Sequence, residues 1–82
     1  MNQPLTDLQR KAQKALLDDR LTKKHGIEVL EEDGVVTLKG SVPSRKIKKL
    51  AASILRDVRN IDRVVNKLQV NDEHEILKRI LR

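Results

Sequence analysis

The chain has 82 residues, of which 37% are charged, and a formal net charge of +6 at neutral pH. Its lack of cysteine excludes disulfides and thiolate metal ligands, and no run approaches the roughly 20 apolar residues that cross a bilayer. With no aromatic side chain, the core of one small domain must be built from Leu, Ile, Val and Ala. The basic balance favours anionic partners: acidic lipid headgroups, an acidic protein surface or nucleic acid.

The first predicted element is a helix from Leu5 to Lys24. Thr6 and Gln9 have the spacing of a capping box, in which two side chains satisfy the first backbone N–H groups of a helix. Gly26 is expected to end the helix. An apolar stripe at helical spacing is wide enough to predict contact with more than one neighbouring element. The stripe consists of Leu8, Ala12, Ala15 and Leu16, widened by Leu17 and Leu21.

A β-hairpin is predicted from Ile27 to Val42. Asp33-Gly34 lies between two runs rich in β-branched residues, and this dipeptide favours a type I′ turn because both residues tolerate positive φ. With the pair at the turn centre, Glu28 faces Lys39, and these opposite charges support the register. Two strands alone are marginally stable, so the apolar face needs a cover. That face carries Ile27, Val29, Val36, Leu38 and Val42.

A second helix is predicted from Ser44 to about Arg59, after Pro43 interrupts strand pairing because it has no N–H to donate. Ser44 is the expected N-cap, and Ser41 as cap or Pro43 at the first helical position are alternatives. This helix has the strongest amphipathic pattern in the chain. Asn60 can adopt the left-handed backbone conformation with which a chain commonly ends a helix. The apolar positions are Ile47, Leu50, Ala51, Ile54, Leu55 and Val58.

A third strand is predicted from Val64 to Val70, with Asn66 on its inward face and in need of a hydrogen-bond partner. Residues 71–82 form a C-terminal extension with capping-box residues and a short basic amphipathic pattern. Such a stripe usually packs on its own sheet or on a second copy, and the competing interpretation is a helix lying on a membrane surface. The pattern consists of Ile76, Leu77, Ile80 and Leu81 with Lys78, Arg79 and Arg82.

These elements follow the order α-β-β-α-β. They predict an α+β two-layer sandwich over residues 5–70, with two helices packed on one face of a three-stranded mixed sheet, and a candidate short C-terminal helix. A connection as long as the second helix suits parallel pairing of the third strand.

The second helix begins with a cluster of cations. The helix dipole is positive there, so each cation costs a few tenths of a kcal/mol, whereas helix N–H groups and cations together suit an anion. The alternative is the solvated face of a basic protein, and the sequence leaves both interpretations open. The candidate anion- and lipid-binding residues are Arg45, Lys46, Lys48, Lys49, Arg56 and Arg59.

Nothing in the chain assembles a catalytic, metal or cofactor site. His25 and His74 are isolated, with no HxH or HExxH spacing. Asp18 and Asp19 are adjacent on a helix and so point in different directions, which excludes an acid–base pair. Asp19 is instead expected to cap or pair locally. The residues therefore predict no catalytic constellation.

From Leu8 to Val70 the chain resembles a BON domain, a small module of bacterial envelope and osmotic-stress proteins. One departure is Asn60, where the family usually has Gly. The matching residues are Ala15, Leu16, Asp19, Leu21, Ile27, Val29, Asp33, Gly34, Val36, Leu38, Gly40, Val42, Ala51, Ile54, Val58, Ile61, Val64, Asn66, Leu68 and Val70.

The resemblance implies a non-catalytic module that associates peripherally with anionic phospholipid or with a cell-envelope partner. Many BON proteins are exported with a leader. No leader is recognisable in this sequence, so the chain as written is expected to be cytoplasmic, and periplasmic or envelope-associated if a leader was removed.

Two other functions compete. Nucleic acid could bind the basic helix, although the chain lacks aromatic side chains for base stacking and the GXXG loop of a KH module. The domain could also be a structural module that self-associates through Leu30, Val35 and the C-terminal stripe.

Overall fold

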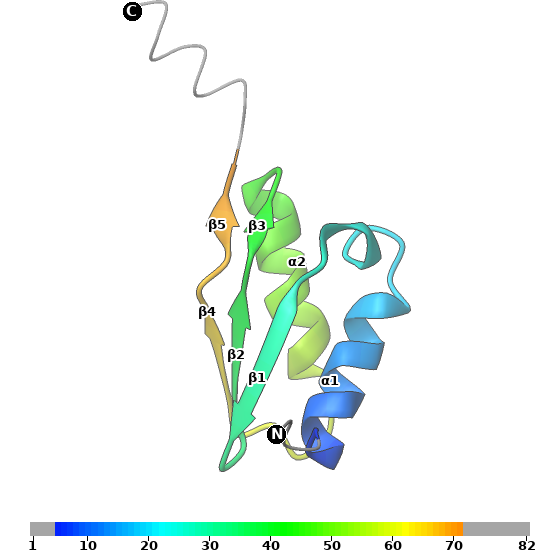
Figure 1. The fold of residues 1–82 in the computed structure, drawn as a ribbon, viewed down its shortest axis with the longest axis vertical. Helices are drawn as coiled ribbons and strands as arrows, with labels where there is room; N and C mark the ends of the chain where they lie inside the picture. Colours follow the sequence, from blue (N-terminus) through cyan, green and yellow to red (C-terminus); the bar gives the residue numbers. More distant parts are fainter. Residues whose placement is uncertain (1–4, 72–82) are drawn as a thin grey trace, which may run out of the picture.

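The computed structural model describes residues 5–71, and its sheet has two helices on one face (Figure 1). The elements in chain order are α1 (Asp7–Leu17), the single-turn 3₁₀ helix η1 (Lys23–His25), β1 (Glu28–Glu32), β2 (Val35–Lys39), β3 (Ser41–Val42), α2 (Arg45–Arg56), β4 (Arg63–Asn66) and β5 (Gln69–Val70). In the main sheet β2 is central, β1 is antiparallel to it and β4 is parallel to it. The predicted α+β sandwich with a mixed sheet is confirmed.

The hairpin of β1 and β2 has the predicted register, with Glu28 opposite Lys39. Asp33 and Gly34 have φ angles of 52° and 85°, the positive values that a type I′ turn needs at both central residues. The turn also holds the chain that leads into β4, because the N–H of Asp62 donates to the Gly34 carbonyl at 2.9 Å. A Cβ on Gly34 would lie 3.2 Å from the Asp62 Cβ, so close packing as well as φ favours glycine there.

The first helix is shorter than predicted, because α1 ends at Leu17 instead of Lys24. Side chains beyond its end take over the backbone hydrogen bonds. The Asp19 carboxylate accepts from the N–H groups of Leu21 and Thr22 at 2.8 and 3.3 Å, as the expected local cap. The buried Thr22 hydroxyl donates to the Leu16 carbonyl at 2.6 Å. These local bonds compete with helix continuation, and a periodic apolar pattern does not reveal them.

The apolar stripe of α1 is also narrower than predicted. Ala12 and Leu16 are buried, whereas Leu17 and Leu21 are 58% and 50% exposed. At the N-terminus, the Thr6 hydroxyl accepts from the Gln9 N–H at 3.1 Å, as the capping box predicts. The Gln9 side chain, however, donates to the Val29 carbonyl of β1 at 2.8 Å instead of turning back to the cap. That bond satisfies a carbonyl on the edge strand of the sheet.

The second helix begins as predicted, with the Ser44 hydroxyl accepting from the Ile47 N–H at 3.2 Å. It ends at Arg56 instead of Arg59, and Asn60 then has the expected left-handed conformation with φ of 72°.

The predicted third strand is divided into β4 and β5. The neighbouring strand is interrupted at the same level, where Gly40 lies between β2 and β3. Gly40 has φ of 131° and separates β2 from β3, which pairs in parallel with β5. At this break Asn66 has the partners it was expected to need. Its amide donates to the Lys48 carbonyl at 2.7 Å and accepts from the Leu68 N–H at 3.2 Å, which ties β4 to α2.

The core lies between the helices and the covered face of the sheet and is entirely aliphatic. It is formed by Ala12, Leu16, Ile27, Val29, Val36, Leu38, Val42, Ala51, Leu55 and Leu68. The predicted C-terminal stripe lies outside the described residues, and the boundary between residues 5–70 and 71–82 stays a prediction.

Candidate anion-binding surface

Three of the predicted cations form a single row on α2. At 100° per residue, Arg45, Lys49 and Arg56 lie within about 40° of one another around the helix axis. All three are exposed, whereas Ala51, about 140° away around the helix axis, is fully buried. We call these three residues the basic ridge.

The other three predicted cations have different surroundings. Lys46 is exposed and lies on the flank of α2 that also carries Leu50. Lys48 is half-buried on the side of Leu55, and its carbonyl accepts the hydrogen bond from Asn66. Arg59 lies beyond the end of α2, in the turn before β4. The six residues therefore do not form one continuous surface.

The start of α2 can supply backbone donors beside the ridge. The Ile47 N–H donates to the hydroxyl of the N-cap Ser44, and the Lys48 N–H donates to the Ser44 carbonyl at 3.2 Å. Within residues 5–71, no acceptor is found for the N–H groups of Arg45 and Lys46. Because these donors lie at the positive end of the helix dipole, they can add to the attraction of the side chains for an anion.

A hollow of about 570 Å³ lies between α2 and the connection from α1 to η1. It brings Arg20 and Lys24, together with the carboxylates of Asp18 and Asp19, to the flank of α2 that carries Leu50. Leu21 in the same hollow is 50% exposed. Sequence reasoning missed this grouping because it placed residues 5–24 on one helix. The signal for it was the pair Asp19 and Thr22, residue types that bond to nearby backbone and end helices.

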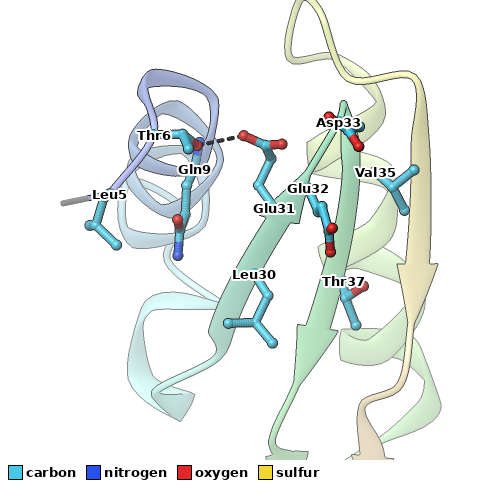
Figure 2. A pocket seen from close by; sticks show the side chains of 9 residues that line it. All are labelled: Leu5, Thr6, Gln9, Leu30, Glu31, Glu32, Asp33, Val35 and Thr37. Atoms are coloured by element: carbon cyan, nitrogen blue, oxygen red, sulfur yellow. Dashed lines mark hydrogen bonds between the residues drawn. The ribbon is translucent and has the colours of Figure 1, made fainter. Parts of the chain in front are cut away.

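A second hollow, of about 750 Å³, lies against β1 and the start of α1 (Figure 2). Its polar lining includes the carboxylates of Glu31, Glu32 and Asp33. Such a lining repels anions, so this acidic groove is distinct in chemistry from the surface of α2.

Glu31 is held in place by two hydrogen bonds. The Thr6 hydroxyl donates to it at 2.6 Å (dashed in Figure 2) and the Gly34 N–H donates at 3.2 Å. Both favour the charged form, so the Thr6 bond first and the Gly34 bond second lower the pKa of Glu31 below its ordinary value.

This lowered pKa predicts acid sensitivity. A carboxyl group with a lower pKa in the folded state stabilises the fold above its unfolded pKa, and the contribution disappears as pH falls through the folded value. We expect the stability difference between the wild type and Glu31→Gln to shrink as the pH is lowered below about 4. Urea unfolding at several pH values measures it. In an NMR titration, Thr6→Ala should raise the pKa of Glu31, and an unchanged value would contradict the assigned cause.

In the part of the chain described, no helix is long and apolar enough to span a bilayer. Nor do residues 5–71 contain a group of three or more His, Cys, Asp or Glu side chains placed to hold a metal ion.

Comparison with curated proteins gave no match. A family model of the BON domain matches residues 4–72. This match includes α1, the hairpin, α2 and both β4 and β5. Because the match covers most of the sequence, the chain belongs to the BON domain family.

Proposed function

We propose that the domain is a non-catalytic module that associates peripherally with anionic phospholipid surfaces. The observation that carries the proposal is the exposed basic ridge of α2. The hollow on the Leu50 flank of the same helix adds Arg20, Lys24 and the half-exposed Leu21, next to the carboxylates of Asp18 and Asp19. BON domains are small domains associated with phospholipid binding, which supports the same function. A cell-envelope protein with an acidic surface would be recognised by the same cations.

The energetics favour a surface rather than a single small anion. Each Lys or Arg close to an acidic bilayer contributes about 1 kcal/mol, and the contribution falls off within a Debye length of about 8 Å at physiological salt. Several cations on one side of α2 can therefore sum to useful affinity although none is in a deep pocket. Leu21 and Leu50, which line the hollow on the Leu50 flank of α2, offer apolar contact to the region below the headgroups.

Liposome sedimentation tests the proposal. The full chain should sediment with vesicles containing phosphatidylglycerol and not with phosphatidylcholine vesicles, and added salt should weaken the association. A variant in which glutamine replaces Arg45, Lys46, Lys48 and Lys49 should lose the binding and keep the circular dichroism spectrum of the wild type.

A matched control removes the same number of cations elsewhere, with glutamine at the exposed Arg10, Lys11, Lys14 and Lys39. This variant should retain most of the binding. Unchanged sedimentation of the α2 variant would overturn the site, and tighter binding to duplex DNA or RNA than to acidic vesicles at matched salt would favour nucleic acid as the partner.

A further inference from the structure

The acidic groove opens on the face of the sheet that the helices leave uncovered. Figure 2 shows Leu30 on β1 and Val35 and Thr37 on β2, with Leu5 just before α1 on the opposite side of the view. Leu30 and Leu5 are 38% and 42% exposed. The groove thus combines apolar side chains with a cluster of three carboxylates, in a chain whose net charge is strongly positive.

The apolar and acidic side chains of the groove restrict which kind of partner can bind in it. Two copies of β1 cannot pair edge to edge without bringing Glu28, Glu31 and Glu32 of one copy against the same residues of the other. An anionic headgroup is excluded for the same reason. The complementary partner is a short segment that combines apolar and cationic side chains.

The chain contains such a segment. Residues 76–82 read Ile-Leu-Lys-Arg-Ile-Leu-Arg, so they supply aliphatic side chains for the apolar part of the groove and cations for its carboxylates. We propose that the acidic groove binds residues 76–82 of a second copy of this chain. Reciprocal insertion of two such segments closes a dimer, the commonest symmetric assembly.

The end of the described chain lies far from the groove, which favours a segment from a second copy as the bound partner. The described chain ends at Asn71, whose N–H donates to the Val42 carbonyl at 2.7 Å. Val42 lies at the opposite end of the sheet from the Asp33-Gly34 turn (Figure 1). A rise of about 3.3 Å per residue puts Val42 roughly 23 Å from Val35 in the groove.

In the helical form that the spacing of its apolar residues predicts, the C-terminal segment is shorter than this separation. The apolar positions of residues 72–82 follow a helical pattern, and a helix of that length spans only about 16 Å. Such a helix cannot extend from Asn71 to the groove of its own chain, whereas one from a neighbouring molecule can. This inference does not depend on the proposed lipid surface, which lies on α2.

Sedimentation velocity of the full chain over a range of concentrations tests the proposal. The wild type should reach twice the monomer mass. The groove variant Leu30→Thr/Glu32→Lys and the tail variant Lys78→Glu/Arg79→Glu should each remain monomeric at concentrations where the wild type is dimeric. The control Glu28→Lys makes the same charge change on β1 outside the groove and should still form dimers.

Mixing the two variants gives the decisive result. The groove variant keeps an intact segment and the tail variant keeps an intact groove, so an equimolar mixture should form a 1:1 complex. A wild type that is monomeric throughout, dimers that persist in both variants, or a mixture that stays monomeric would each overturn the proposal. Circular dichroism of each variant confirms that the fold is retained, and liposome binding tests the α2 surface separately.

Discussion

Replacing Leu38 by alanine is expected to destabilise the domain by about 2–5 kcal/mol, the range for truncating a buried leucine. Leu38 is fully buried on the central strand, opposite Val29 and level with Asn66 of β4. The loss combines the transfer free energy of the removed methyl groups with the cavity left behind. Since the core contains no aromatic ring and is only one layer deep, little around the site can move to fill that cavity.

The expected loss is large relative to the total, because small domains have unfolding free energies of about 5–15 kcal/mol. Urea unfolding followed by far-ultraviolet circular dichroism measures it directly. Leu17→Ala is the matched control, since Leu17 is 58% exposed on α1 and its truncation should change stability by less than about 0.5 kcal/mol. Equal losses in the two variants would contradict the assignment of Leu38 to the core.

The features predicted correctly from sequence are those set by neighbouring residues. Asp33-Gly34 fixes the turn type, and the turn type together with the alternating apolar pattern fixes the pairing of β1 with β2. The cap at Ser44 and the left-handed Asn60 are likewise local choices of backbone conformation.

The features that were missed depend on contacts between distant segments or on competing hydrogen bonds. The apolar pattern continues through Leu17 and Leu21, but Asp19 and Thr22 end the helix by bonding to the backbone. Gln9 had an obvious local partner at the cap and bonds instead to Val29 of β1. The choice between such partners is made by tertiary packing, which residue spacing does not report.

In the candidate site too, the features set by local sequence were predicted and those set by contacts between distant segments were missed. Helical periodicity alone puts Arg45, Lys49 and Arg56 on one ridge. It does not show that Arg20 and Lys24 approach the same helix, because their position depends on where α1 ends. Arg59 was assigned to the ridge by extending α2 three residues too far.

Removing the basic ridge is expected to weaken binding to acidic vesicles by about 100-fold. Glutamine at Arg45, Lys49 and Arg56 deletes three cations that each contribute about 1 kcal/mol near an acidic surface. Because α2 is amphipathic and these residues project from its exposed side, all three can approach a flat bilayer together. The measurement is vesicle binding at constant salt, with thermal unfolding to confirm that stability is retained.

A second triple variant separates a specific surface from net charge. Glutamine at Arg59, Arg63 and Lys67 removes the same number of exposed cations from the turn after α2 and from β4 and the residue after it. If the ridge lies on the bilayer, these positions contribute less, because screening reduces attraction beyond about 8 Å. The second variant should then weaken binding much less than the first. Equal losses would mean that the domain is attracted by its overall charge, and the ridge would then have no special role in the association.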